Sequence, residues 1–251
     1  MELRDSVALI TGTSRGLGFE VARAFAKRGA RLIVTARDRD ALARAAEMIR
    51  RDAAGAAPPE GLLAIPGDVG DPDHAERLVR EGLRRFGQID ILVNNASALG
   101  PSPMPPLADL SPSALWSILR VNVLAPHALA RLVLPPMRAR RSGIIVNVTS
   151  DAGVEAYPGW GGYGASKAAL EHLSRVLAAE LDGSGVRVYV VDPGDMNTQM
   201  HREAEPGVDL SHLPAPAAVA PAFVTLVERG AAPFGRFVAR CVEREIGRVA
   251  S

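Results

Sequence analysis

The sequence predicts an α/β fold in which helices wind doubly around a seven-stranded parallel sheet, giving three layers in a single domain over residues 1–251. Short β-branched runs alternate with longer amphipathic segments, which is the pattern of strand–helix units. The apolar runs are continuous, as is typical of strands covered on both faces. Of the 251 residues, 47% are hydrophobic and 23% are charged, and no compositional break divides the chain. This length suits one large domain.

The elements follow from hydrophobic periodicity. Seven strands are expected at Val7–Ile10, Leu32–Val34, Leu62–Ile65, Ile89–Val93, Ile144–Val148, Val186–Val191 and Phe234–Val238. Apolar residues recur every three or four positions in six helical segments, at 17–28, 39–53, 72–86, 112–138, 163–182 and 216–229. Asp38, Asp71 and Ser111 stand at N-cap positions, and Pro126 should kink the long fourth helix. Two segments without periodicity, Ser97–Ala108 and Gly194–Ala215, are expected to be functional loops, the second of them a substrate loop.

Composition narrows the function classes. The formal net charge is +1, which gives no electrostatic footprint for nucleic acid. The single cysteine, Cys241, cannot form an internal disulfide, and the five histidines are scattered without ligand spacing, so no metal site is expected. The first residues carry no signal-peptide pattern, and no stretch approaches the roughly 18 apolar residues of a membrane span. The expected setting is cytoplasmic, with no membrane partner.

A glycine-rich turn follows the first expected strand, in the segment Thr11-Gly12-Thr13-Ser14-Arg15-Gly16-Leu17-Gly18. Glycines 12, 16 and 18 allow a tight turn and a close approach to a diphosphate, which amide groups at the next helix N-terminus would bind. This is the chemistry of Rossmann-type dinucleotide binding. Two other interpretations stay open: a glycine turn without a ligand, and a Gly-x-Ser-x-Gly nucleophile elbow that would make Ser14 a hydrolase nucleophile. The elbow is disfavoured because only one strand precedes it, whereas an elbow draws an oxyanion donor from an earlier loop.

The end of the second expected strand indicates which dinucleotide would bind. An NAD site usually places an acid there for the ribose hydroxyls, but this chain reads Ala36-Arg37. A small residue followed by arginine leaves room for a 2′-phosphate and supplies a forked cation, and Arg15 can reach it from the glycine turn. NADP(H) is therefore favoured over NAD(H). NAD(H) stays open through Asp38, although Asp38 fits better as a helix cap.

A serine, a tyrosine and a lysine suggest carbonyl chemistry. Ser150 ends the fifth strand, and Tyr163 and Lys167 are an i, i+4 pair, about 6 Å apart along a helix. A nearby ammonium stabilises a phenolate, so Lys167 is expected to move the tyrosine pKa toward the working range for proton transfer. Ser150 could donate a hydrogen bond to the same substrate oxygen. The chain has 27 arginines and only two lysines, so a lysine at position 167 is unusual for a surface cation.

Jointly these residues resemble the short-chain dehydrogenase/reductase family, in its Tyr-x-x-x-Lys branch, over about residues 6–199. The resemblance implies that Tyr163 is the general acid–base, Ser150 orients the substrate oxygen, Lys167 binds the nicotinamide ribose and Asn122 holds a proton-relay water. It also implies that Asp68 meets the adenine and that Asn95 and Ala96 meet the adenine-side ribose region. The segment from Pro193 to Thr198 would meet the nicotinamide. The expected cofactor-binding residues are thus Gly12, Ser14, Arg15, Gly16, Leu17, Gly18, Arg37, Asp68, Val69, Asn95, Ala96, Tyr163, Lys167, Pro193, Gly194, Met196 and Thr198.

Simpler roles exist for some of these residues, and the chain departs from the family at two places. Asn122 could be a helix-kink residue, Asp68 a turn former and Thr198 a cap. Ser97 replaces the glycine usual after Asn-Asn-Ala, which could alter the loop over the site. The end of the chain lacks the glycine-containing segment that packs in tetramers, so a homodimer through the helices at 112–138 and 163–182 is favoured over a tetramer.

The predicted function is an NADP(H)-dependent oxidoreductase that interconverts a ketone or aldehyde with its alcohol. The substrate pocket is expected between Ser97–Met104, Val154–Trp160 and Met196–Leu213, with an apolar component from Tyr157, Trp160, Met196 and Met200. The alternatives are a non-catalytic cofactor-binding sensor or scaffold of the same fold and, less favoured, the Ser14 hydrolase.

Overall fold

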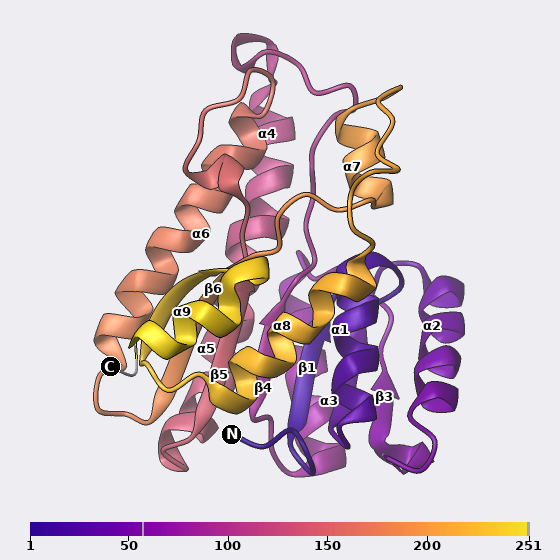
Figure 1. The fold of residues 1–251 in the computed structure, drawn as a ribbon, viewed down its shortest axis with the longest axis vertical. Coiled ribbons are helices and arrows are strands. Elements are labelled where there is room, and N and C mark those ends of the chain that lie inside the picture. The colour runs from indigo at the N-terminus through magenta and orange to yellow at the C-terminus, as the bar shows by residue number, and fades with distance from the viewer. Residues whose placement is uncertain (57, 250–251) are drawn as a thin grey trace.

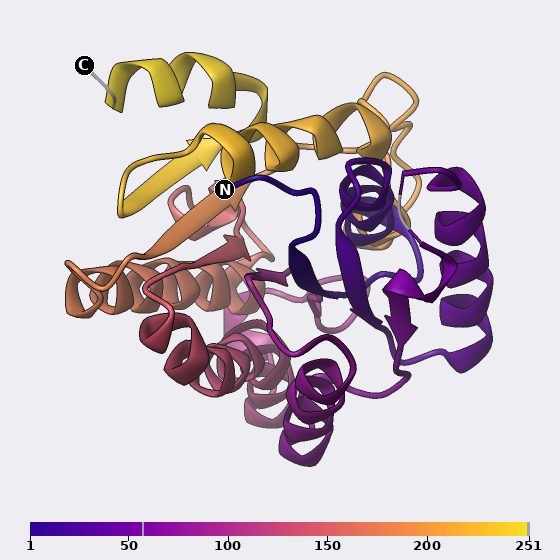
Figure 2. The same ribbon diagram turned by 90° about the horizontal axis from the view of Figure 1, so that it is seen from below.

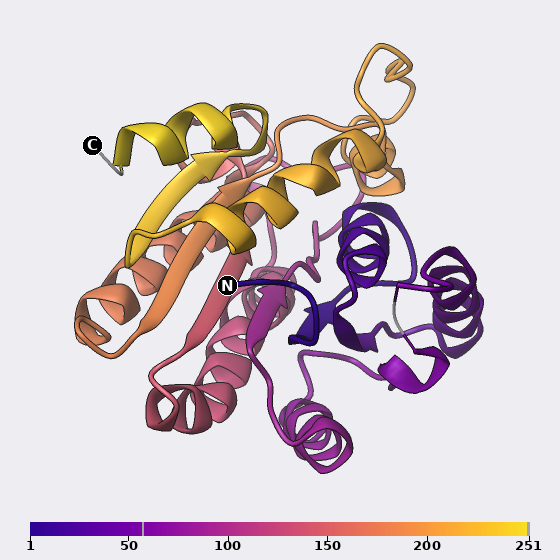
Figure 3. The same ribbon diagram turned by 60° about the horizontal axis from the view of Figure 1, so that its bottom comes forward.

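Seven parallel strands form one sheet in the order β3-β2-β1-β4-β5-β6-β7 (Figure 1). The computed structural model describes residues 1–56 and 58–249. The strands are β1 (Val7–Thr11), β2 (Arg31–Thr35), β3 (Leu62–Ala64), β4 (Ile91–Asn94), β5 (Gly143–Val148), β6 (Val186–Asp192) and β7 (Phe234–Val238). All neighbouring pairs are parallel, and Figure 3 shows the strands side by side. The predicted doubly wound, seven-stranded fold is confirmed.

Helices cover both faces of the sheet. They are α1 (Gly16–Lys27), α2 (Arg39–Asp52), α3 (Pro72–Phe86), α4 (Pro112–Leu119), α5 (Ala125–Ala139), α6 (Gly161–Glu180), α7 (Gln199–Ala204), α8 (Pro216–Arg229) and α9 (Val242–Val249). Figure 2 shows α1 and α8 above the sheet and α3, α5 and α6 below it. Each face has its own buried apolar cluster, one including Phe25 and Phe223 and the other Leu78 and Val133. The caps expected at Asp38, Asp71 and Ser111 are present.

The long helix expected at 112–138 is interrupted. A π-helical turn, Arg120–Leu124, separates α4 from α5, and Pro126 follows it in the first turn of α5. Because proline has no N–H, it cannot donate to the carbonyl of Asn122 four residues earlier, so a regular α-helix cannot continue there. The expected disruption at Pro126 therefore takes the form of a π turn around Asn122.

The stretch Pro112–Ala139 has the length and apolar composition of a helix that could cross a membrane, contrary to the expectation that no stretch of the sequence approaches a membrane span. Core helices of soluble proteins pass the same test, and 44% of its most apolar window is buried in the fold.

Two helices were not expected from the sequence. The six-residue α7 lies within the segment 194–215 that the sequence presents as a loop, and α9 follows β7 near the end of the chain. The carboxyl ends of β1, β4, β5 and β6 meet at one edge of the sheet, beside α7 in the upper part of Figure 1. In open α/β sheets, ligands bind at this edge.

Candidate active site

The turn after β1 is shaped for a diphosphate. Gly12 and Gly16 have φ angles of 72° and 63°, which favour glycine. The amides of Gly12 and Thr13 donate to the carbonyl of Thr35 on β2, which fixes the turn to the sheet. The N-terminus of α1 has no side-chain cap and no acidic residue in its first turn. A Cβ at position 16 would meet no atom from outside its own turn within 4 Å, so there is open space beside Gly16 at the start of α1, where helix amides can bind an anion.

Asn95 ties the end of β4 to this turn. Its side-chain amide donates to the carbonyls of Thr11 (2.9 Å) and Gly12 (3.3 Å). The backbone amides of Asn95 and Ala96 both donate to the Thr11 hydroxyl. A Cβ on Gly18 would collide with the Asn95 amide and the Gly12 carbonyl, so this glycine is needed for close packing. Asn95 thus supports the glycine turn, in addition to the ribose contact that the family resemblance implies.

The two arginines expected to bind a 2′-phosphate are both exposed. Arg15 lies just before α1, and Arg37 lies shortly after β2. Asp38 uses its carboxylate to cap α2, accepting from the amides of Asp40 (3.0 Å) and Ala41 (2.9 Å). These backbone hydrogen bonds, with Arg44 and Arg15 nearby, hold the pKa of Asp38 below its usual value. The interpretation of Asp38 as a helix cap is confirmed.

Asp68 lies after β3 with Val69 buried beside it. Its carboxylate accepts from the amide of Gly70 (2.9 Å) and from the guanidinium of Arg120 (2.9 Å). Burial alone would raise the pKa of Asp68, but these two contacts outweigh it and the pKa is lowered. Asp68 is therefore both a turn former and the partner of Arg120, a residue that the sequence reading did not single out.

Tyr163, Lys167 and Ser150 come together beside a cavity. Tyr163 and Lys167 lie on α6 and are buried, Lys167 being only 2% exposed. The ammonium of Lys167 lies 5.3 Å from the centre of the Tyr163 ring and donates to the carbonyl of Val148 (2.9 Å). Ser150 lies two residues after the end of β5, with its hydroxyl close to the tyrosine oxygen.

The pKa values of this pair differ from the sequence expectation. Burial raises the pKa of Tyr163 to about 12, although hydrogen bonding by Ser97 and Ser150 acts in the opposite direction. Burial also lowers the pKa of Lys167 to about 8. The expectation that Lys167 brings the tyrosine pKa toward neutrality is wrong for this structure, because loss of hydration disfavours both charged forms. Tyr163 consequently keeps its proton at neutral pH.

The hydroxyl of Ser150 is hydrogen-bonded to neighbouring residues. Its hydroxyl donates to Asp151 (3.0 Å) and accepts from the amide of Ala152 (3.2 Å). The other oxygen of Asp151 accepts from the hydroxyl of Tyr157 (2.9 Å). To donate to a substrate oxygen, as the sequence suggests, the Ser150 hydroxyl has to rotate away from Asp151.

Asn122 and Ser97 are hydrogen-bonded to each other near Tyr163. The Asn122 side chain is buried and forms a reciprocal pair with the backbone of Ala98, at 2.7 and 2.9 Å. It also donates to Ser166 (2.9 Å), whose hydroxyl donates to the backbone carbonyl of Tyr163. Ser97 donates to the Asn122 carbonyl oxygen (3.2 Å). Asn122 therefore connects the π turn with the loop after β4 and with α6. It does more than mark a helix kink, the simpler role considered above.

A cavity of about 270 Å³ opens beside Ser150 and Tyr163. Its wall includes Leu99, Tyr157, Trp160, Met196 and Met200, from the three expected segments. Pro193, Gly194 and Thr198 also line it, and Thr198 caps α7 by accepting from the amide of His201 (3.1 Å). The sequence reading missed the acidic part of the wall, namely Asp151, Asp192, Asp195 and Glu205. No periodicity or motif marks these carboxylates as neighbours.

Two other expectations concern residues outside this cavity. Ser14 lies half-buried in the glycine turn, and within residues 1–56 and 58–249 no histidine is hydrogen-bonded to it, as a hydrolase nucleophile requires. Across the same residues, no group of three or more His, Cys, Asp or Glu side chains is arranged to hold a metal ion.

Comparison with known proteins agrees with this geometry. The family model described as short chain dehydrogenase matches residues 6–209. Ketoacyl reductase HetN from Nostoc is 38% identical over 192 residues, covering 76% of this chain and 64% of the relative, so this chain is shorter than that relative. A short chain dehydrogenase structure from Pseudomonas syringae has a TM-score of 0.85 and 31% identity, covering 95% of this chain and 96% of the other.

A further solved structure bears on the cofactor. A short chain dehydrogenase from Shigella flexneri, crystallised with NADP, has a TM-score of 0.85 and 27% identity, and covers 95% of this chain and 98% of the other. The expectation that NADP(H) is favoured agrees with this neighbour. The glycine turn, the Ser150–Tyr163–Lys167 set and these matches together establish that the chain belongs to the short-chain dehydrogenase/reductase family of oxidoreductases.

Proposed function

We propose that this protein is an NADP(H)-dependent oxidoreductase that interconverts a ketone or aldehyde with the corresponding alcohol, with Tyr163 as general acid–base. The observation that carries the proposal is the position of Tyr163 and Ser150 at the wall of a cavity, with Lys167 over the tyrosine ring, next to the edge of the sheet that holds the glycine turn. When bound, the nicotinamide cofactor supplies or accepts the hydride.

The residues present fit an NADP(H) cofactor. The open space beside Gly16 leaves room for a diphosphate at the N-terminus of α1, and Arg15 and Arg37 stand exposed where a 2′-phosphate would need cations. The segment Pro193–Thr198 and Lys167 would hold the nicotinamide end. These assignments rest on the family resemblance together with the positions of the residues along one edge of the sheet.

The protein groups suit carbonyl reduction in particular. With a pKa of about 12, Tyr163 carries its proton at neutral pH and can donate it to the substrate oxygen as negative charge develops there. The phenolate left behind is stabilised by Ser97 and Ser150, the two groups that act to lower the tyrosine pKa. A proton returning from solvent restores the tyrosine for the next turnover.

The cavity wall indicates a substrate class. Tyr157, Trp160, Met196 and Met200 form an apolar surface, so a substrate with an apolar or aromatic group is expected. Asp151, Asp195 and Glu205 disfavour an anionic substrate, and His201, the one potential cation of this wall, pairs with Glu205 at 3.4 Å. Neutral carbonyl compounds should therefore react better than keto acids of the same size.

The test is cofactor oxidation with a panel of matched carbonyl compounds. We expect NADPH fluorescence titration to show tight binding, NADH to bind more weakly, and neutral aryl ketones or aldehydes to be reduced. NADPH binding without turnover on any neutral, cationic or anionic carbonyl would instead favour the non-catalytic sensor or scaffold. Labelling of Ser14 by a fluorophosphonate would support the hydrolase, and preference for NADH would contradict the role of the two arginines.

A further inference from the structure

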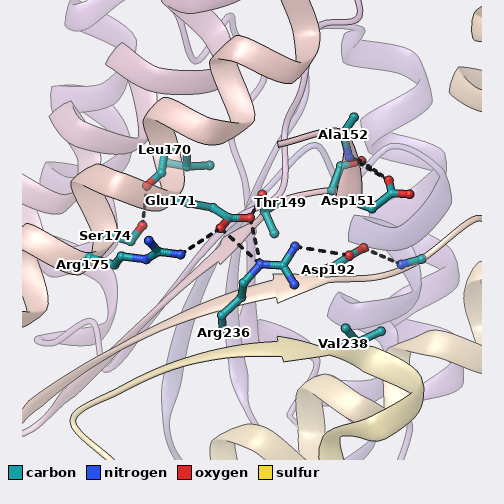
Figure 4. A network of polar contacts seen from close by, with 12 residues as sticks. Thr149, Asp151, Ala152, Leu170, Glu171, Ser174, Arg175, Asp192, Arg236 and Val238 are labelled. Atoms are coloured by element: carbon teal, nitrogen blue, oxygen red, sulfur yellow. Dashed lines mark hydrogen bonds and ion pairs between the residues drawn. The ribbon is translucent and has the colours of Figure 1, made fainter. Parts of the chain in front are cut away.

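Arg236, on β7, joins the buried carboxylates of Glu171 and Asp192 (Figure 4). Its Nε lies 3.1 Å from each carboxylate oxygen of Glu171 on α6. Its Nη2 lies 3.5 Å from Oδ2 of Asp192, the last residue of β6. Both carboxylates are at least 95% buried, at 4% and 5% exposure. The sequence reading assigned no role to any of these three residues.

The Glu171 side of this cluster reaches the residue before Ser150. Oε1 of Glu171 accepts from the hydroxyl of Thr149 (2.8 Å). The amide of Thr149 donates to the carbonyl of Val191 (2.8 Å), which continues the pairing of β5 with β6. Thr149 is therefore held at both its backbone and its side chain. Because Ser150 follows it directly, the position of Ser150 depends on Glu171.

The Asp192 side reaches the segment expected to hold the nicotinamide. Oδ1 of Asp192 accepts from the amide of Gly194 (2.9 Å), which shapes the turn that begins the segment Pro193–Thr198. Gly194 has a φ of 71°, so this turn departs from strand geometry immediately after β6. Asp192 is also one of the residues that line the cavity. A shift of Asp192 would thus move the start of this segment.

Arg236 is the main counter-ion of the pair. Arg175 approaches Glu171 only at 3.6 Å and its side chain is 56% exposed, whereas the Arg236 side chain is 25% exposed. Asp151 adds further negative charge near Asp192. Burial raises the pKa of Asp192, and Arg236 opposes that shift. Without Arg236, two buried carboxylates would repel each other with little compensation.

We propose that Arg236 is a positioning residue, which fixes Ser150 through Glu171 and Thr149 and fixes the Pro193–Thr198 segment through Asp192. This inference rests on the proposed function in that it concerns the same site. It predicts that Arg236 affects both catalytic efficiency and cofactor affinity, although β7 contributes no side chain to the cavity wall described above.

The experiment compares Arg236→Gln, Arg236→Lys and a control. The control is Arg140→Gln. Arg140 is 31% exposed and, like Arg236, pairs with a largely buried carboxylate, that of Asp90 (3.3 Å). Asp90 lies just before β4, at the amino ends of the strands and thus away from the cavity. We expect Arg236→Gln to lower kcat/KM by about 10- to 100-fold, because small displacements of positioned groups cost this much. NADPH binding, followed by fluorescence without substrate, should weaken several-fold. Arg236→Lys should recover part of both.

The pH dependence separates positioning by charge from a loss of folding. The groups facing the two carboxylates are Arg236, Arg175, Asp151 and Tyr163. Burial already raises the pKa of Asp192, and Arg236→Gln removes the cation that opposes this rise, so protonation of Asp192 should relieve the repulsion as pH falls. The ratio of variant to wild-type kcat/KM should therefore rise as the pH is lowered. The double variant Arg236→Gln with Glu171→Gln, which removes one negative charge and keeps an oxygen for Thr149, should recover activity at pH 8.

Arg140→Gln should lower thermal stability and leave kcat, KM and NADPH affinity unchanged. The proposal is overturned if Arg236→Gln behaves like Arg140→Gln, or if its activity ratio is independent of pH and the double variant is no better. The NADPH titration distinguishes this failure from failure of the proposed function. Wild-type protein that binds NADPH but reduces no carbonyl would contradict the function, while a weakened NADPH affinity in Arg236→Gln alone would still support the positioning role.

Discussion

The ammonium of Lys167 lies over the ring of Tyr163, 5.3 Å from its centre, and both groups are buried. The ammonium donates its hydrogen bond to the carbonyl of Val148, and not to the tyrosine oxygen. Burial therefore works against the charge on each group, lowering the pKa of Lys167 and raising that of Tyr163. Tyr163 therefore keeps a proton that it can donate. The buried charge of Lys167 lowers the stability of the folded protein.

The variant Lys167→Met should reveal this loss of folding stability. The pKa of Lys167 is about 8 in the folded protein and near 10.5 when unfolded, so the unfolded chain binds more protons between these values. Wild-type stability should rise with pH through this window, because the penalty for the buried charge is full below pH 8 and gone above about 10.5. The stability advantage of Lys167→Met over wild type should accordingly narrow from pH 8 to pH 10.5. Chemical denaturation across this range checks it, and a constant difference would contradict it.

Ser97 should tune the acidity of Tyr163. It donates to Asn122 and lies within hydrogen-bonding reach of Tyr163, where it acts to lower the tyrosine pKa. In Ser97→Ala we expect the pH at which alcohol oxidation reaches half its maximum to rise by up to about one unit, the size of one hydrogen bond. Ser117→Ala, which alters an exposed serine on α4, is the control and should leave the profile unchanged. An unshifted Ser97→Ala profile would show that Ser97 only supports the loop.

Much of this architecture was predictable because its causes are local. Continuous apolar runs indicated all seven strands, and Asp38, Asp71 and Ser111 marked helix starts. Spacing indicated the glycine turn and the Tyr163–Lys167 pair. The Arg236 cluster was not predictable, because Arg236 lies 65 residues from Glu171 and 44 from Asp192, and no periodicity links them. The sign of the Tyr163 pKa shift was also missed, because it depends on burial, which spacing does not reveal.

Cofactor preference should depend on Arg37. Arg37→Asp replaces the proposed partner of the 2′-phosphate by a repelling charge, so NADPH binding should weaken by about 10- to 100-fold, the effect of one charged hydrogen bond. NADH binding should be unchanged or stronger. The matched control is Arg51→Asp, at an exposed arginine in the last turn of α2. Equal weakening of NADPH and NADH in Arg37→Asp would mean that Arg37 does not contact the phosphate.

The homodimer implied by the family resemblance predicts a specific surface. Trp116 on α4 is 59% exposed, and Leu173 on α6 is 41% exposed. If these helices form the interface, burial of such large apolar side chains drives association. The variant Trp116→Glu with Leu173→Glu should be monomeric in analytical ultracentrifugation while wild type is dimeric. A dimer that persists in the variant would place the interface elsewhere.

The most direct test of the central claim is Tyr163→Phe, measured for turnover and for NADPH binding in the same preparation. Removing the hydroxyl deletes the proton donor and leaves the ring that packs against Trp160 and Lys167. We expect carbonyl reduction to fall by at least about 10²- to 10⁴-fold, with NADPH affinity within a few-fold of wild type. Turnover close to wild type in the variant would contradict the assignment of Tyr163 as the general acid–base.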